Sequence, residues 1–360
     1  MLFVIVANNI RLINKYVLVY VMAFLFVQVA LSIAHSDFTY ISFTVACLFS
    51  FISLFYSYKF IGINKLVNTF INIMLFCLLL SSITSVLSVL GLIDYVSVFN
   101  NPDGRESYNF ILSFTNSLLV TPNGYFIRAS GFFDEPGTLA YFASFAFFLN
   151  EIRKGSFKVS LSIAALTVLS TWSLAFIIVI GFYFIISALF NKKYTLYVCA
   201  LSVILGGLLL VASNTDTDLS KRVMRLTVDR LSLSDDGKLK GDNRSGPMLV
   251  ALDNIQQSPV FGLGRSDQHV NGYAGANIFT PFARDGVVGG LIYYSPFIIL
   301  IVCSILKCRR FDGYMSSKEF VAIVCIGLNL LQRPNLNAGF EMIIMFVLAY
   351  AIYGNKRMIQ

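Results

Sequence analysis

The chain has 360 residues, of which 57% are hydrophobic and only 13% are charged. A soluble domain of this length needs far more polar surface, so the composition excludes an ordinary soluble enzyme and predicts a polytopic membrane protein. The net charge of +8 is high, but a basic excess in a membrane protein reflects topology, so we expect no nucleic-acid partner.

The cysteines lack the spacing of a disulfide framework or a zinc site. There are six of them, most lie inside apolar runs, and none forms a CxxC or Cys/His cluster. We interpret them as small packing residues and expect no metal site. No small-residue cleavage site follows the first apolar stretch, which predicts that the N-terminal segment is retained.

Apolar runs predict the membrane spans in chain order. Runs of suitable length lie at 16–34, 38–58, 66–90, 137–149, 194–213 and 287–306. Residues 159–190 contain no charge, and as one helix they would be about 48 Å long, against a hydrocarbon core of about 30 Å. The polar residues 170–173 near their middle therefore predict two short spans joined by a tight turn. Residues 319–353 divide in the same way at 332–335, giving about ten spans in all.

The basic residues predict the orientation of these spans. With the N-terminus in the cytoplasm, every short cytoplasmic connection is basic, as the positive-inside rule requires. This holds only if 159–190 forms two spans, because a single span would place Lys192 and Lys193 outside. We therefore expect one integral membrane domain over residues 1–360, with both termini cytoplasmic and two long external segments, 91–136 and 214–286. Near the end of the second segment, GPMLVALDNIQQ has helical apolar spacing and predicts a short interfacial helix.

The stretch YFIRASGFFDEPG, residues 125–137, places charged groups at the entrance of a predicted span. Charges there are costly unless they are paired, solvated or bound to a ligand. Pro136 suits the first turn of a helix, and acids just before it interact favourably with the positive end of that helix. The simpler interpretation is that Asp134 and Glu135 cap the helix and that Arg128 pairs with one of them; the alternative is a ligand site.

Four stretches in this order carry a resemblance to a known family: RASGFFDEPG, LSTWSLAFIIVI, NRSGPMLVALDNIQQSPVFGLG and NIFTPFARDGVVGGLIYY. Over about residues 125–306, the chain resembles the O-antigen polymerase and O-antigen ligase superfamily. The resemblance implies an all-α membrane bundle similar to the lipid-sugar glycosyltransferases. It also implies a metal-independent enzyme without a cofactor, in the bacterial inner membrane, which transfers a glycan from undecaprenyl pyrophosphate to a sugar hydroxyl on the outer face. Membrane lipids, a chain-length regulator and a flippase are the implied partners.

The residue types suit this chemistry. A departing diphosphate needs positive charge, and arginine binds phosphate oxygens bidentately while remaining charged. Arg128 and Arg244 match the family pattern and are the first catalytic candidates. The acceptor hydroxyl needs a base, for which we expect Glu135, with Asp134 and Asp285 in reserve. The candidates for binding substrate or diphosphate are Arg265, Arg284, Asn277 and Asp134.

Plainer interpretations of these residues stay open, as do other functions. Arg265 is alternatively a solvated loop charge, and Arg284 alternatively pairs with its neighbour Asp285. Ligases of the superfamily carry a His-Asn pair where this chain has Ala276-Asn277, which favours polymerisation over ligation. A flippase or transporter would place charges inside its spans and show internal repeats, whereas here the polar residues lie in the external segments. An unrelated structural or interaction protein is the remaining alternative.

Overall fold

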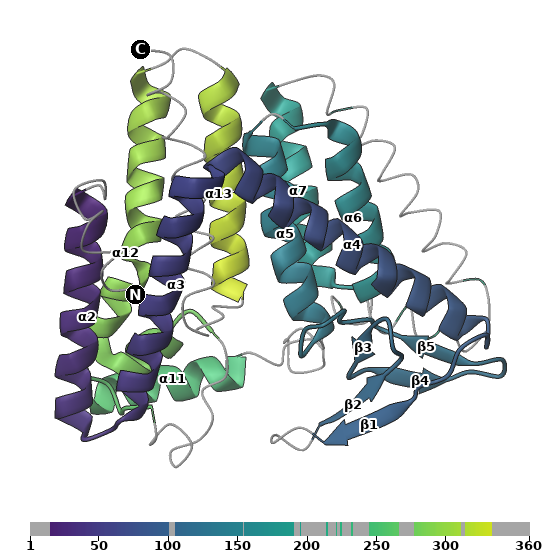
Figure 1. Ribbon diagram of the computed structural model, residues 1–360, viewed down its shortest axis with the longest axis horizontal. Helices are drawn as coiled ribbons and strands as arrows, with labels where there is room; N and C mark the ends of the chain where they lie inside the picture. Colours follow the sequence, from purple (N-terminus) through teal and green to yellow (C-terminus); the bar gives the residue numbers. More distant parts are fainter. Residues whose placement is uncertain are drawn as a thin grey trace. The chain divides into compact units, whose positions relative to one another are not determined.

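The computed structural model describes residues 15–100, 105–153, 155–190, 245–265, 277–310 and 314–332, and the single residues 195, 214, 221, 224 and 232. This part of the chain is mostly helical and also contains five short β-strands (Figure 1). The spans predicted over 194–213 and after Gln332 lie outside the described residues.

The chain divides into two compact units, each built from separate parts of the sequence. Unit 1 comprises Met1–Val67, Asn243–Leu306 and Leu330–Gln360, and unit 2 comprises Asn68–Asp242 and Lys307–Asn329.

Unit 1 contains a helical pair, α2 (Lys15–His35) and α3 (Thr39–Ile61), together with α11 (Ser245–Gln257) and most of α12 (Thr280–Arg310). Phe24, Cys47 and Phe51 form a buried apolar cluster between α2 and α3, and Ile292 and Tyr293 of α12 pack against it. Helices α2 and α3 match the first two predicted spans within a few residues. The predicted short helix before Pro259 is confirmed as α11.

Two glycines allow the segment after α11 to cross the start of α12 in backbone contact. The amide N–H groups of Leu263 and Gly264 donate to the carbonyls of Ala283 and Arg284, each at 3.0 Å. Gly286 has the left-handed φ of 68° and interrupts the helical geometry of α12. A Cβ on Gly286 would lie 2.0 Å from the Val260 carbonyl oxygen, and a Cβ on Gly262 would lie 2.3 Å from that of Arg284. Side chains at either position are therefore excluded by sterics.

Unit 2 contains three helices packed side by side, α5 (Pro136–Ile152), α6 (Phe157–Thr171) and α7 (Leu174–Phe190), and most of α4 (Ile63–Val89) (Figure 1). The predicted break within 159–190 is confirmed, because only Trp172 and Ser173 separate α6 from α7. Trp172 ends α6 in the left-handed conformation, with φ 49°, and its N–H donates to the Val168 carbonyl at 3.1 Å.

The strands of unit 2 lie in the segment between α4 and α5. In chain order they are β1 (Ser97–Asn100), β2 (Glu106–Asn109), β3 (Phe114–Thr115), β4 (Leu118–Val120) and β5 (Tyr125–Ile127). The first three form an antiparallel sheet in the order β1-β2-β3, and the last two form a hairpin. The all-α prediction therefore holds for the predominantly helical character of the described chain but missed these strands. Strands of two to four residues are too short to show a clear alternation of apolar and polar side chains.

The length and apolar composition of a helix determine whether it can cross a membrane. Of the residues that the structure describes, one helix, Asn64–Val89, is long and apolar enough to cross a membrane. Shorter apolar segments lie in α2, α3, α6, α7 and α13 (Tyr314–Gln332). The multi-pass arrangement of about ten spans stays a prediction.

Candidate functional site

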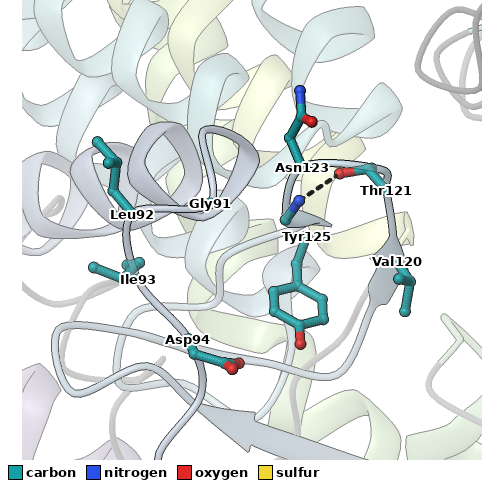
Figure 2. Close-up of a pocket in the computed structure, with 9 residues that line it drawn as sticks. Gly91, Leu92, Ile93, Asp94, Val120, Thr121, Asn123 and Tyr125 are labelled. Carbon is teal, nitrogen blue, oxygen red and sulfur yellow. Dashed lines mark hydrogen bonds between the residues drawn. The ribbon is translucent and has the colours of Figure 1, made fainter.

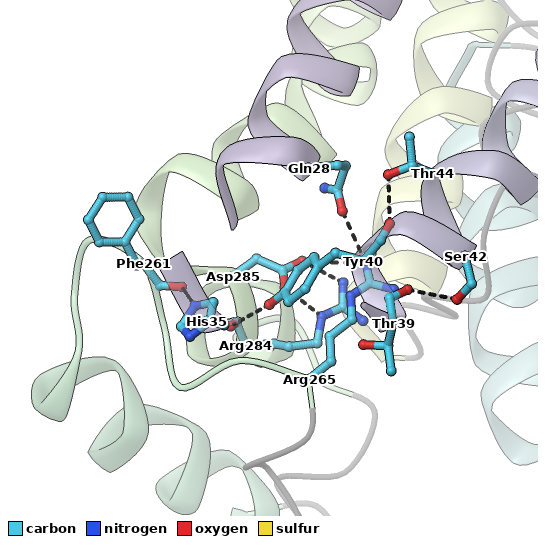
Figure 3. A network of polar contacts seen from close by, with 10 residues as sticks. All are labelled: Gln28, His35, Thr39, Tyr40, Ser42, Thr44, Phe261, Arg265, Arg284 and Asp285. Atoms are coloured by element: carbon cyan, nitrogen blue, oxygen red, sulfur yellow. Dashed lines mark hydrogen bonds and ion pairs between the residues drawn. The ribbon is translucent and has the colours of Figure 1, made fainter. Parts of the chain in front are cut away.

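Two arginines in unit 1 share one carboxylate (Figure 3). Arg284 donates from Nε to Asp285 Oδ1 at 2.9 Å and from Nη2 to Oδ2 at 2.6 Å, a bidentate ion pair. Arg265 Nη2 lies 4.0 Å from the same Oδ2. Because the three residues meet in one place, we call them, with Gln28 and Tyr40, the arginine cluster.

Residues from the first two helices surround these charges. The Tyr40 hydroxyl donates to Asp285 Oδ1 at 2.9 Å, and Arg265 Nη2 donates to Gln28 Oε1 at 3.4 Å. The guanidinium carbon of Arg265 lies 3.6 Å from the centre of the Phe43 ring and 4.6 Å from that of Tyr40. At these distances both rings attract the cation through their π faces. Arg265 is thus held by helices far from it in sequence.

The arginine cluster has an excess positive charge in a place that water reaches poorly. The side chains of Arg265, Arg284 and Asp285 are 13%, 11% and 3% exposed. Burial and, after it, the nearby charge of Arg284 lower the pKa of Arg265 to about 10, although the charge of Asp285 opposes the change. Burial alone would lower the pKa of Arg284 too, but the charge and hydrogen bonds of Asp285 raise it overall. Both arginines are therefore cationic at neutral pH, and among the described residues Asp285 is the carboxylate that pairs with them.

One donor of the arginine cluster has no hydrogen-bond partner among the residues that the structure describes. Arg265 Nε is buried and has no hydrogen-bond partner in the described part of the chain. Buried polar groups are normally satisfied, and buried charge is normally compensated. An excess cation with an unused N–H group can be satisfied by an anion, and phosphate oxygens are suitable acceptors.

The backbone crossing at Gly262 and Gly286 explains how these arginines meet. Arg265 directly follows Gly264, whose N–H donates to the Arg284 carbonyl at 3.0 Å. His35, at the end of α2, supports the same segment by donating from Nε2 to the Phe261 carbonyl at 2.9 Å, and its ring stacks on Tyr40 with the centroids 5.9 Å apart. The crossing at Gly262 and Gly286 therefore brings Arg265 beside Arg284.

The structure thus brings two of the predicted substrate-binding residues, Arg265 and Arg284, together with Asp285, one of the two reserve bases. The alternative of a solvated Arg265 is wrong, since its side chain is largely buried, while the alternative pairing of Arg284 with Asp285 is confirmed. Both Asp285 oxygens already accept hydrogen bonds from Arg284, and Oδ1 also accepts one from Tyr40. We therefore interpret Asp285 as the group that positions Arg284.

Asn277 lies at the junction of α11 and α12. It is 5% exposed, its Nδ2 donates to the Pro247 carbonyl at 3.3 Å, and its Oδ1 accepts from the Phe279 N–H at 2.9 Å. These contacts give it a structural role at the start of α12; its predicted contact with substrate stays a prediction.

Glu135 and Asp134 lie in unit 2, immediately before α5. Pro136 occupies the first turn of α5 as predicted, but the Glu135 side chain makes no capping hydrogen bond. Its carboxylate, 18% exposed, instead accepts from Nη1 of Arg105. Asp134 is exposed, and its backbone carbonyl accepts from Asn116 Nδ2 at 3.5 Å.

Arg128 joins the strand region to the break between α6 and α7. Its Nε donates to the Thr171 carbonyl at 2.9 Å, and the N–H of Ala129 donates to the Ser170 carbonyl at 2.8 Å. A cation is favourable near the last carbonyls of a helix. The simpler interpretation needs correction in one part: the Glu135 side chain does not cap α5 but pairs with Arg105. The Arg128 Nε is bound to the end of α6, and the pairing of Arg128 with one of the two acids stays a prediction. Arg244, the other predicted catalytic arginine, lies outside the described residues.

The contacts of three polar residues, Gln28, Tyr40 and Arg105, were not predicted from the sequence. Gln28 is a polar residue inside an apolar run, which is costly without a partner and could have marked it. Tyr40 carried no such signal, because aromatic residues are common at span ends. Arg105 lies in a polar stretch of the first external segment, and nothing in that stretch indicates its pairing with Glu135.

Within the described residues, no group of three or more His, Cys, Asp or Glu side chains is placed to hold a metal ion. Comparison with known proteins found no family model that matches the chain and no curated protein with significant similarity.

Proposed function

We propose that this protein is a multi-pass membrane glycosyltransferase that polymerises lipid-linked oligosaccharide repeat units, of O-antigen or a related surface polysaccharide. The donor is a glycan on undecaprenyl pyrophosphate, and the reaction takes place on the outer face of the bacterial inner membrane. The support is the sequence resemblance together with one observation: a buried cluster of two arginines and one carboxylate, with a guanidinium N–H that has no hydrogen-bond partner among the described residues.

In this proposal the arginine cluster binds the diphosphate. As the glycosidic C–O bond to the diphosphate breaks, negative charge grows on the leaving oxygen, and preorganised cations stabilise that charge. Asp285 holds Arg284 in a fixed orientation through a bidentate pair. Arg265, which has the weaker contacts, supplies the unused donor.

Glu135 is the proposed general base in unit 2. It would take the proton of the acceptor hydroxyl as that oxygen bonds to the sugar carbon. The contact with Arg105 orients its carboxylate.

The test is a deletion strain complemented with variants and examined by gel for its lipopolysaccharide. The deletion should give lipopolysaccharide capped with a single repeat unit in place of a ladder. Arg265→Gln should fail to restore the ladder at normal protein abundance, Arg265→Lys should restore it in part, and Lys65→Gln, which removes an exposed cation, should restore it fully. Loss of all capping in the deletion strain would instead indicate a ligase, and loss of export would indicate a flippase. A full ladder with Arg265→Gln would refute the role of the arginine cluster.

A further inference from the structure

A pocket lies in unit 2, where the turn after α4 meets the β4–β5 hairpin (Figure 2). It has a volume of about 420 Å³, and its polar side chains come from Asp94, Thr121, Asn123 and Tyr125. We call it the hairpin pocket. None of these residues belongs to the proposed diphosphate site or is the proposed base.

The frame of the hairpin pocket is made of backbone in close contact. A Cβ on Gly91 would lie 1.8 Å from the Asn123 carbonyl oxygen, and a Cβ on Gly124 would lie 2.2 Å from that of Ser88. The Ser88 hydroxyl donates to the Tyr125 carbonyl at 2.9 Å, which joins the end of α4 to β5. Because the two turns touch without intervening side chains, the polar groups between them are held in fixed positions.

The side chains of the hairpin pocket combine an aromatic ring with hydrogen-bonding groups. The Tyr125 ring is held edge to face by Tyr95 and Phe110, with centroids 5.8 and 6.3 Å away. Its hydroxyl and the Asp94 carboxylate point into the same space, whereas the side chain of Asn123 points away from both (Figure 2). Sugars present the complementary chemistry: pairs of hydroxyls for a carboxylate or an amide, and C–H faces for a ring.

The charge of the hairpin pocket argues against a phosphate ligand. Among its lining residues the charged side chain is Asp94, an exposed carboxylate, which repels anions. Its open, polar shape also differs from the enclosed apolar sites that bury most of a small-molecule cofactor. We propose that the hairpin pocket binds the uncharged sugar residues of an oligosaccharide. This inference rests on the proposed function in one respect, which is that the proposed function determines the oligosaccharide used in the test.

The experiment measures saccharide binding to the full-length protein in detergent. The probe is the repeat-unit oligosaccharide released from the surface polysaccharide of the source strain, without lipid or phosphate, and binding is followed by calorimetry. Asp94→Asn should weaken binding about tenfold or more, the usual effect of losing a charged hydrogen bond. Tyr125→Leu, which removes the aromatic ring and its hydroxyl, should abolish binding, while Asp253→Asn, an exposed carboxylate on α11, should leave it unchanged.

A second probe, inorganic pyrophosphate, separates this inference from the proposed function. Asp94→Asn and Tyr125→Leu should bind pyrophosphate as the wild type does, and Arg265→Gln should lose pyrophosphate but keep the saccharide. If the wild type binds no saccharide, or if both pocket variants bind it normally, the hairpin pocket inference is overturned whatever happens to pyrophosphate. If the pocket variants lose saccharide binding while Arg265→Gln still binds pyrophosphate, the inference stands and the proposed function loses its support.

Discussion

Asp285 is the residue on which the arginine cluster depends, because its carboxylate compensates part of the charge of two guanidinium groups. Replacing it with asparagine keeps the shape but leaves Arg284 buried without a counter-charge. Breaking a buried pair in this way typically costs about 3–5 kcal/mol.

We therefore expect Asp285→Asn to lower the unfolding midpoint of the purified protein markedly. Thermal unfolding in detergent measures it, with Asp253→Asn as the control, because that carboxylate is exposed and its loss should change little. Equal midpoints for the two variants would show that the ion pair contributes nothing to stability.

Replacing Glu135 should change the activity of the protein and not its stability. It is partly exposed and its side chain makes no capping hydrogen bond to α5, so Glu135→Gln should leave the fold intact. If it is the base, polymer formation should fall by about 100-fold or more, the usual contribution of general base catalysis. Polymer length and amount in the complemented deletion strain measure this; Glu106→Gln, at an exposed acid of β2, is the matched control. Comparable polymer from both variants would exclude Glu135 as the base.

At the scale of elements, the contact between the segment after α11 and the start of α12 is the feature most sensitive to side-chain size. Gly286→Ala would place a methyl group against the Val260 carbonyl and strain a left-handed backbone. Such strain alone costs about 1–3 kcal/mol, and the clash adds to it.

The expected result is a lower unfolding midpoint and weaker pyrophosphate binding, since Arg265 would be displaced from Arg284. Gly246→Ala in α11 is the control, because a Cβ there meets nothing within 4 Å. Identical stability and binding for both alanine variants would mean that the crossing is not what positions Arg265.

At the scale of the whole molecule, the open prediction is which side of the membrane each segment faces. Periplasmic-reporter fusions within 91–136 and 245–265 should be active, and fusions within 153–158 should be inactive, because basic residues near span ends remain cytoplasmic. Placement of 91–136 or 245–265 in the cytosol would remove the proposed reaction, since both candidate sites would then face the wrong compartment.

The sequence by itself determined where helices form. The apolar runs at 16–34, 38–58 and 66–90 match α2, α3 and α4, and the polar residues between Ser170 and Ser173 mark the end of α6 and the start of α7. These are local properties, because a helix that must bury apolar side chains, in lipid or in a core, is limited by the length of its own apolar run.

Only the tertiary structure decided which charged residues meet. The pairing of Arg105 with Glu135, the binding of Arg128 to the end of α6 and the sharing of Asp285 by Arg265 and Arg284 all join separate segments. The glycines at 262 and 286 were visible in the sequence. The sequence did not show that backbone of the other segment lies so close to each of them that a side chain is excluded. Hydrophobic patterns report the burial of one segment; the partner of a buried charge depends on how distant segments cross.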